Sequence, residues 1–302
     1  MPTRRKVILD TDIGTDIDDS WALGLLLKSP ELQLELVLTA TGDTRYRAAV
    51  AARFLQKAGS PSIPIGIGIK STGNPPFVQT LSPCLEEDYL GKAGTTVYDD
   101  GIAQAIRLFE SEDEMTVIAI GPLTNIGELC RRRPDLIGKV RLVAMGGSIR
   151  KNFHDDDGQV AEYNITEDIQ AAQAVFSASW KEFILTPLDH CGNLILRGED
   201  YRRIARADTP LTREILYEYH TWLKYMRLPS DGQERESSVL FDTAAVHLAT
   251  TTEDSELKRF ELVVDERGFL RESPEGKPVL VALDWKNRDC FLRSLSNALI
   301  EG

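Results

Sequence analysis

The most informative segment of the chain lies near the amino terminus and reads Val7-Ile8-Leu9-Asp10-Thr11-Asp12-Ile13-Gly14-Thr15-Asp16-Ile17-Asp18-Asp19-Ser20-Trp21-Ala22-Leu23. Its apolar start predicts a short buried strand, and the apolar residues after Asp19 recur at helical spacing. Five aspartates therefore lie in and around the turn that joins a strand to a helix. In open α/β sheets, this is where ligands bind.

The density of carboxylates in this turn points to a cation. Aspartate caps helices well, but a negative charge at a helix start gains only about 0.3–1 kcal/mol. Capping needs one or two of these residues, and the remaining charges repel one another unless a cation neutralises them. Because the ligands are all oxygens, the sequence predicts a hard-metal site that suits calcium or magnesium better than zinc.

Composition narrows the class of partner. The 302 residues allow one large α/β domain or two smaller ones, and 42% hydrophobic content supplies a sizeable core. The net charge of -12 argues against nucleic-acid binding, which needs a basic surface, and leaves a small molecule as the expected substrate. No apolar run is long enough for a membrane span.

The cysteines and the amino terminus favour a cytoplasmic protein. The basic start, Met1 to Lys6, leads directly into the first strand and does not resemble a secretory leader. The cysteines form no C-x-x-C pair, so we expect reduced thiols rather than a zinc or redox motif. They are Cys84, Cys130, Cys191 and Cys290.

Strand-like and helix-like segments alternate along most of the chain. This rhythm predicts an α/β fold: an open, mostly parallel doubly wound sheet with helices on both faces. The expected strands are 32–40, 63–67, 115–120, 140–145 and 183–185. The expected helices are 46–57, 101–110, 123–132 and 166–176, the last with Thr166 as its N-cap.

The rhythm changes after Asp189, where we expect a C-terminal helical elaboration of a single domain spanning 1–302. Helices are predicted at 211–226, 241–249 and 289–299. The segments 260–265 and 279–281 are expected to pair as strands, across a turn at Gly268 or one at 274–276. The turn-rich segment 70–100 is predicted to be a long functional loop.

Polar residues follow several predicted strands, and the carboxyl ends of parallel strands meet at one edge of a sheet. They are Thr41-Gly42-Asp43, Gly121-Pro122-Leu123-Thr124-Asn125, Gly146-Gly147 and Asp189-His190. Each is weak evidence alone, since Gly and Asp are common in loops. Glu162-Tyr163-Asn164 is either a turn or part of the site, and Asp242 is either an N-cap or a site residue.

Together these residues resemble the inosine-uridine preferring nucleoside hydrolase family over nearly the whole length of the chain. The first of the shared motifs is the family's signature, and all five occur in order. They are Asp10-Thr11-Asp12-Ile13-Gly14 with Asp18-Asp19, Gly121-Pro122-Leu123-Thr124-Asn125, Met145-Gly146-Gly147, Glu162-Tyr163-Asn164 and Phe241-Asp242.

The resemblance implies a calcium-dependent enzyme that cleaves the N-glycosidic bond of ribonucleosides or related N-ribosides. It implies that the side chains of Asp12, Asp19 and Asp242 bind Ca²⁺ together with the carbonyl of Ile120. Asp12 would also be the general base, and Asp18 would accept a hydrogen bond from the ribose 2′-hydroxyl. Glu162 and Asn164 would hold the 5′ end of the sugar. Family members commonly form dimers or tetramers, so a homodimer or homotetramer is expected.

Residue chemistry agrees with these implied roles. A vicinal diol is a good ligand pair for calcium, which accepts six to eight oxygens in loose geometry. A cation lowers the pKa of water, and a nearby carboxylate can take the proton. Cleavage of a glycosidic bond passes through an oxocarbenium-like state, which carboxylates stabilise.

The chain departs from the family pattern at three points. Thr15-Asp16-Ile17 separates Gly14 from the aspartate pair, two residues more than usual, so either Asp16 or Asp18 faces the ribose, and we favour Asp18. Asp43 stands where Asn is common, and is expected to bind the metal or a sugar hydroxyl. Phe241 replaces the histidine that protonates the leaving base.

The loss of that histidine leaves the leaving-group acid open. Phe241 is expected to stack on the base, and His220, Tyr219 or Trp222 on the aromatic helix, or solvent, would assist departure. The simpler interpretation of that helix is core packing.

Two other functions compete with the hydrolase interpretation. A haloacid-dehalogenase-like phosphatase also places Asp-x-Asp after its first strand and binds magnesium, but normally has Thr or Val where Gly14 stands. A non-catalytic calcium and ribose-binding homologue is the other alternative, and the retention of Asp12 argues against it.

Overall fold

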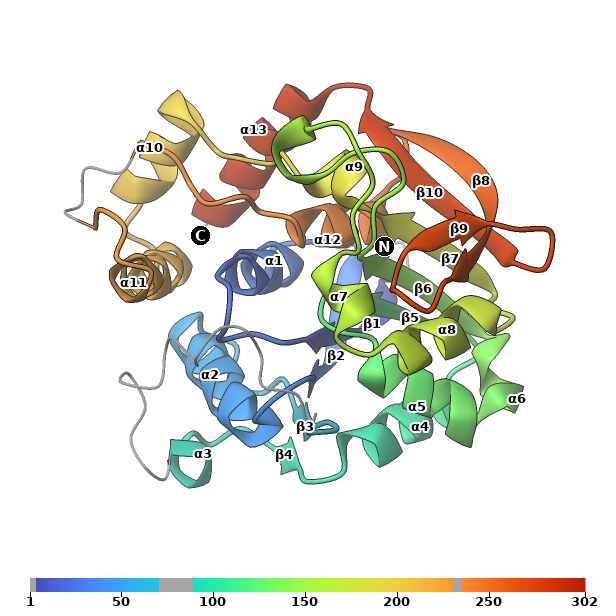
Figure 1. Cartoon of the computed structure of the whole chain (residues 1–302). Coiled ribbons are helices and arrows are strands. Elements are labelled where there is room, and N and C mark those ends of the chain that lie inside the picture. The colour runs from blue at the N-terminus through green and yellow to red at the C-terminus, as the bar shows by residue number, and fades with distance from the viewer. Residues whose placement is uncertain (1–3, 71–88, 231–234, 302) are drawn as a thin grey trace.

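The computed structural model describes residues 4–70, 89–230 and 235–301. Within these ranges the strands join into one ten-stranded sheet. The strands are β1 (Arg5–Thr11), β2 (Leu32–Thr39), β3 (Ile65–Ile67), β4 (Val97–Tyr98), β5 (Met115–Ala119), β6 (Val140–Met145), β7 (Glu182–Thr186), β8 (Ser255–Val264), β9 (Leu270–Glu272) and β10 (Lys277–Trp285). Their spatial order is β4-β3-β2-β1-β5-β6-β7-β10-β8-β9, and Figure 1 shows them crossing the molecule.

The strands β1 to β7 are all parallel, as predicted. β1 lies in the middle of this set, with Leu9 opposite Val37 of β2 and Ile118 of β5. The chain order therefore reverses at β1, and the carboxyl ends of β1, β5 and β6 lie next to one another at one edge. Such a reversal is the position at which doubly wound sheets bind ligands.

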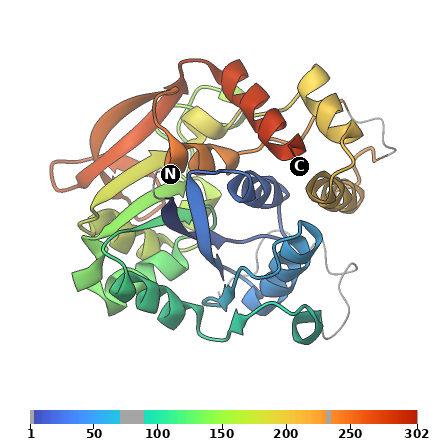
Figure 2. The ribbon, with the colours of Figure 1, turned by 180° about the vertical axis from the view of Figure 1, so that it is seen from behind.

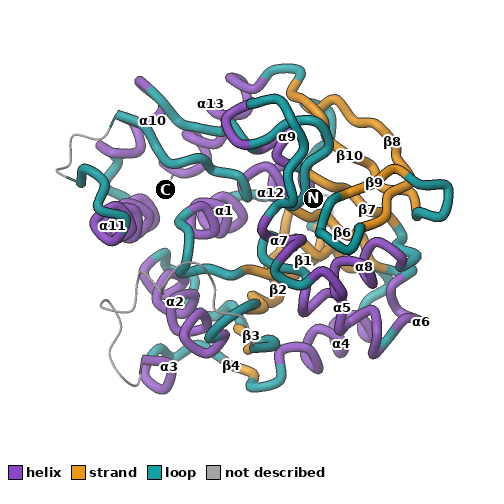
Figure 3. Tube along the Cα trace, in the orientation of Figure 1, coloured by secondary structure: helices purple, strands orange, loops and turns teal. Residues whose placement is uncertain are grey.

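Alternation along the strands divides the core in two. Val7 and Leu9 face one hydrophobic cluster, whereas Ile8 faces the other, because successive strand side chains point to opposite faces. Helices cover both faces of the sheet. Figure 2 shows the molecule from behind, and Figure 3 shows helices and strands in different colours. The first cluster includes side chains of α1 (Asp18–Leu27), α2 (Thr44–Lys57), α10 (Gly198–Arg206), α11 (Pro210–Tyr225), α12 (Thr243–Thr250) and α13 (Arg288–Ile300). The second includes side chains of α4 (Gly101–Ser111), α5 (Thr124–Arg132), α6 (Pro134–Ile137) and α8 (Ile169–Ser177).

The C-terminal region adds strands as well as helices to the fold. β10 pairs in parallel with β7 and antiparallel with β8, so that Phe260 lies opposite Val279. The short strand β9 lies between them in the chain and pairs with β8. Both turns considered from the sequence therefore occur, one at Gly268 before β9 and one at 274–276 after it.

One predicted cap is wrong. Thr166 ends the short helix α7 (Tyr163–Thr166), and the next helix, α8, is capped by Asp168, whose side chain accepts a hydrogen bond from the amide of Ala171. Two successive helices fill the region where the sequence pattern predicted one. The cap was missed because both residues are good capping types.

The predicted functional loop at 70–100 lies mostly outside the described residues. Its described end forms α3 (Tyr89–Lys92) and β4. Cys130, Cys191 and Cys290 are free thiols, and Cys84 lies outside the described residues. None of the helices in the described ranges combines the length and apolar composition needed to cross a bilayer.

Candidate active site

The turn between β1 and α1 does not use its aspartates to cap the helix. Ile17 occupies the N-cap position of α1, and no side chain makes a capping hydrogen bond there. Asp18 and Asp19 occupy the first turn of α1 instead, with exposed fractions of only 4% and 2%. Thr11 donates its hydroxyl proton to the carboxylate of Asp19. Helix capping therefore does not explain the cluster.

Tertiary folding adds a third acid from the far end of the chain. Carboxylate oxygens of Asp18, Asp19 and Asp242 all lie within 4.8 Å of one another. The amide of Asp242 donates to Asp18 Oδ2 at 3.4 Å. Asp242 precedes α12 but its side chain makes no capping bond. Its carboxylate is thereby left available to the cluster.

Burial and mutual repulsion disfavour the ionised forms of the carboxyl groups in this cluster. Burial raises the pKa of Asp19 well above its ordinary value, and the charges of Asp12 and Asp18 raise it further. Burial, followed by the charges of Asp18 and Asp19, raises the pKa of Asp242 in the same way. A cation would remove this repulsion, and a set of buried oxygen ligands fits a hard metal ion. The residues present therefore fit the metal that the sequence predicted.

Asp12 lines the same cavity, and its backbone accepts a hydrogen bond from the buried side chain of Arg47. The guanidinium of Arg47, from α2, donates to the carbonyl oxygens of Asp12 and Ile13, and its Nε donates to the carbonyl of Thr41 at 2.6 Å. Burial raises the pKa of Asp12, and the charge of Arg47 opposes that shift. Gly121 passes so close that a Cβ there would lie 2.9 Å from Asp12 Oδ1.

Glu162 and Asn164 form a hydrogen-bonded corner of the site. Glu162 caps α7, accepting hydrogen bonds from the amides of Asn164 at 2.9 Å and Gly147 at 2.8 Å. Burial is the largest cause that raises the pKa of Glu162 to about 7. Asn164 Nδ2 donates to the carbonyl of Ile120 at 3.1 Å and to that of Met145 at 3.3 Å. The Ile120 carbonyl, a predicted metal ligand, is thus also an acceptor for Asn164.

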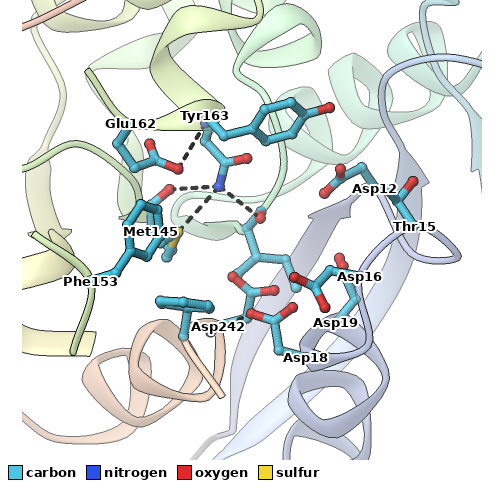
Figure 4. A pocket seen from close by; sticks show the side chains of 13 residues that line it. Asp12, Thr15, Asp16, Asp18, Asp19, Met145, Phe153, Glu162, Tyr163 and Asp242 are labelled. Atoms are coloured by element: carbon cyan, nitrogen blue, oxygen red, sulfur yellow. Dashed lines mark hydrogen bonds between the residues drawn. The ribbon is translucent and has the colours of Figure 1, made fainter. Parts of the chain in front are cut away.

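These groups line one cavity at the carboxyl ends of the strands. Its empty space, including the part open to solvent, is about 720 Å³. Figure 4 shows the aspartates from the two ends of the chain together at one side. The lining residues are Asp12, Thr15, Asp16, Asp18, Asp19, Ile120, Met145, Phe153, Glu162, Tyr163, Asn164, Phe241 and Asp242.

Eight of the ten residues singled out from the sequence line this cavity, and two lie elsewhere. The eight are Asp12, Asp18, Asp19, Ile120, Glu162, Asn164, Phe241 and Asp242. Asp43 instead caps α2, accepting a hydrogen bond from the amide of Tyr46 at 3.0 Å. His220 lines a second cavity on the α2 and α11 side, with Arg53 and Tyr217.

The extra residues of the signature turn also reach the cavity. Asp16 and Asp18 both line it, but only Asp18 belongs to the cluster with Asp242. Asp16 accepts a hydrogen bond from the amide of Ile17 at 2.7 Å, and burial raises the pKa of Asp16 to about 6. Both aspartates therefore face the space where a ligand would bind.

Sequence reasoning missed four lining residues: Thr15, Met145, Phe153 and Tyr163. Met145 and Tyr163 lie inside the motifs Met145-Gly146-Gly147 and Glu162-Tyr163-Asn164, so their position in those motifs could have identified them as site residues. The hydroxyl of Tyr163 is buried and has no hydrogen-bond partner among the described residues. Phe153 lies in a loop whose sequence carries no pattern that points to the site.

Comparison with solved structures identifies the fold. The fold is that of nucleoside hydrolases. An inosine-guanosine nucleoside hydrolase matches with a TM-score of 0.80 and 18% identity, covering 98% of this chain and 99% of that one. A plant nucleoside hydrolase matches with a TM-score of 0.78 and 22% identity, over 99% and 100%. An inosine-uridine preferring nucleoside hydrolase from Bacillus anthracis matches with a TM-score of 0.72 and 19% identity, over 98% and 99%.

The sequence then assigns the family. The chain belongs to the inosine-uridine preferring nucleoside hydrolase family, whose profile matches residues 7–289. A relative from Klebsiella pneumoniae (strain 342), named non-specific ribonucleoside hydrolase RihC, is 33% identical over 211 residues. That alignment covers 65% of this chain and 65% of the relative, so the chain spans about two thirds of the relative's length. A relative of the same name from Salmonella paratyphi B is 35% identical over 205 residues, which are 63% of this chain and 62% of the relative.

Proposed function

We propose that this protein hydrolyses the N-glycosidic bond of ribonucleosides, releasing ribose and the free base. The observation that carries the proposal is the meeting of three distant segments at one cavity: the turn after β1, the start of α7 and the start of α12. Family membership supports a nucleoside as the substrate rather than the phosphoester of the competing phosphatase interpretation.

We propose Ca²⁺ as the cofactor, held by the side chains of Asp12, Asp19 and Asp242 and by the carbonyl of Ile120. The buried, oxygen-only donor set supports this choice, because calcium prefers several oxygen ligands in flexible geometry. When bound, the ion supplies positive charge that attracts the sugar's neighbouring hydroxyls and makes a water molecule more acidic.

The chain's own residues then divide the remaining work. Asp12 accepts the proton of the attacking water as its oxygen bonds to the anomeric carbon. The C–N bond breaks at the same centre, and its electron pair leaves with the base. Asp18 accepts a hydrogen bond from the 2′-hydroxyl, and Glu162 with Asn164 holds the 5′-hydroxyl. The carboxylates stabilise the positive charge that develops on the sugar ring.

The leaving base receives no proton from Phe241, which has no acidic group. We propose that the base departs as an anion or takes its proton from solvent. Purine and pyrimidine ribonucleosides are both proposed substrates, in line with a role in nucleoside salvage in the cytoplasm.

A homodimer or homotetramer is the proposed assembly, and light scattering coupled to gel filtration would measure it.

The test is release of free ribose from inosine and uridine, measured beside release of phosphate from phosphoesters. We expect ribose release by the wild-type protein and a loss of about 10²–10⁴-fold in kcat for Asp12→Asn, which should keep the fold. Asp99→Asn makes the same exchange at a side chain that is 89% exposed, and serves as the control. Near-normal rates for Asp12→Asn would remove Asp12 from the mechanism.

An activated substrate separates hydrolysis from mere binding. p-Nitrophenyl riboside has a good leaving group and needs no protonation of that group. If the wild-type protein binds this compound but never cleaves it, the non-catalytic alternative is correct.

A further inference from the structure

Phe153 holds an aromatic ring at the mouth of the cavity. Phe153 lines the cavity and is large and apolar, yet 43% of its surface is accessible to solvent. Its ring packs edge-to-face on Phe241, with 5.9 Å between ring centroids and 85° between planes. In the view of Figure 4, Phe153 and Asp12 lie on opposite sides of the cavity. The paired rings of Phe153 and Phe241 therefore give this side of the cavity an apolar surface that a ligand in the cavity can contact.

The backbone that presents Phe153 adopts an unfavourable conformation. His154 and Asp155 follow it with φ angles of 61° and 68°, in the left-handed region that non-glycine residues rarely occupy. Consecutive strained residues persist only when surrounding contacts fix them, and such positions concentrate at functional sites.

Contacts from both sides fix this loop. The side chain of Asn152 accepts a hydrogen bond from the amide of Phe153 at 2.7 Å. The amide of His154 donates to the carbonyl of Gly192 at 3.0 Å. The carboxylate of Asp155 accepts a hydrogen bond from Asn193 Nδ2 at 2.6 Å. The backbone that carries Phe153 is therefore fixed by contacts within the protein, and its ring contacts that of Phe241.

The cavity is polar at one side and aromatic at the other. Asp18, Asp19 and Asp242 supply the polar side, which suits hydroxyl groups. Phe153 and Phe241 supply a pair of ring surfaces that offer no hydrogen-bond donor. A ligand that satisfies both sides has a polyhydroxylated part joined to a flat, apolar-faced part, which is the chemistry of a nucleoside.

We propose that Phe153, together with Phe241, forms the surface on which the nucleobase packs, and that Phe153 is a specificity-determining residue. This inference rests on the proposed function and extends it to base recognition. Because the contact uses the π-face that every base has, it tolerates purines and pyrimidines alike. The larger purine surface gains more from the contact, so loss of the Phe153 ring weakens the binding of inosine more than the binding of uridine.

The experiment compares Phe153→Ala, Phe153→Tyr and wild type by steady-state kinetics with inosine and uridine. For Phe153→Ala we expect KM for inosine to rise at least tenfold, with a smaller rise for uridine and kcat within threefold of wild type. Phe153→Tyr keeps the ring and should restore KM to within threefold. Inhibition by free ribose, which has no base, should stay unchanged in both variants.

Leu228→Ala is the matched control, because Leu228 is 45% exposed and does not line the cavity. An unchanged KM in Phe153→Ala would overturn the inference. Equal weakening of inosine binding and ribose binding would also overturn it, because that result indicates a structural role for Phe153. A change in molar mass by light scattering would overturn it too, because that result indicates a role in subunit contact.

Calorimetric binding of inosine in an Asp12→Asn background measures the same contact without turnover. Weakened binding after Phe153→Ala, combined with a wild-type protein that never releases ribose, would refute hydrolysis and keep the role of Phe153. Ribose release by the wild type with unaltered inosine binding in the variant would refute only the role of Phe153. Absence of both binding and turnover would refute both.

Discussion

The amide of Asp242 donates to the carboxylate of Asp18 at 3.4 Å, although the two residues are 224 positions apart in the chain. Asp18 begins α1 and Asp242 precedes α12, and these two helices pack against each other. The candidate site therefore depends on the docking of the C-terminal helices onto the sheet. Any change that disturbs this docking should affect the cluster of Asp18, Asp19 and Asp242 as well.

Removal of divalent metal should abolish activity and lower stability. A ligand that binds only the folded state stabilises it by about 2.7 kcal/mol at a hundredfold excess over its Kd. We therefore expect excess chelator to lower the melting temperature by several degrees and added Ca²⁺ to restore it. A melting curve that is identical with and without chelator would argue against a bound ion.

Asp242→Asn provides the control for that experiment. The variant removes one of three mutually repelling buried carboxylates. In chelator it should melt at or above the temperature of the chelated wild-type protein, and Ca²⁺ should no longer shift its melting curve. A calcium response of normal size in Asp242→Asn would exclude this carboxylate as a ligand.

Gly121→Ala should reduce turnover without altering any polar group. The new Cβ would lie 2.9 Å from both the amide nitrogen and Oδ1 of Asp12, so Asp12 must shift. A displacement of about 1 Å in a catalytic group can cost about 10²-fold in rate, and we expect a loss of that order in kcat. Gly138→Ala is the control, since its Cβ would meet nothing closer than 3.9 Å. Equal rates in the two variants would contradict the role of Asp12.

His190 should make the protein less stable in mild acid. Its ring nitrogens contact Thr186 Oγ1 at 2.9 Å and Ser255 Oγ at 3.0 Å. Burial, with a smaller contribution from His247, lowers the pKa of His190 to about 3. The unfolded chain, with a histidine pKa near 6.5, takes up the proton first, so stability falls as the pH falls below about 6.5. Between pH 7 and pH 5 the loss from this residue should be about 2 kcal/mol.

Denaturant titrations of His190→Gln and wild type at pH 7, 6 and 5 measure this effect. The variant should be less stable at pH 7, because it loses the two hydroxyl contacts, but its stability should fall less steeply toward pH 5. Parallel pH dependences in the two proteins would show that His190 does not carry the acid sensitivity.

His220→Gln should leave turnover close to normal. His220 lines a separate cavity with Arg53 and Tyr217, and does not line the aspartate cavity. We therefore expect kcat for inosine within twofold of wild type. A drop of more than tenfold with an unchanged melting temperature would restore His220 as the leaving-group acid.

Local pattern was sufficient to predict most of the fold. Strand β1 and helix α1 follow from a change of apolar spacing around the aspartates, and the βα rhythm implied the parallel sheet. The misassigned cap at Thr166 shows the limit of such reasoning. Both Thr166 and Asp168 suit a helix start, and only the formed hydrogen bonds distinguish them.

The site was predictable wherever its residues follow strands or belong to the quoted motifs. Asp12, Asp19, Glu162 and Asn164 are of this kind. Asp43 follows β2 as well, but the start of α2 takes its side chain as a cap, a local alternative that the sequence also allowed. His220 lies on a helix, and its place in the sequence did not show which cavity that side of the helix would line.

Spacing and residue type act over short distances, so they were enough to predict which carboxylates end a strand or begin a helix. They could not predict that Asp18 and Asp242 share one buried cluster, or that Phe153 faces the cavity across from Asp12 (Figure 4). Those positions depend on helix docking and on loop contacts such as that between Asp155 and Asn193, which join residues far apart in the chain. Side chains distant in sequence meet only when the packed core brings their elements together.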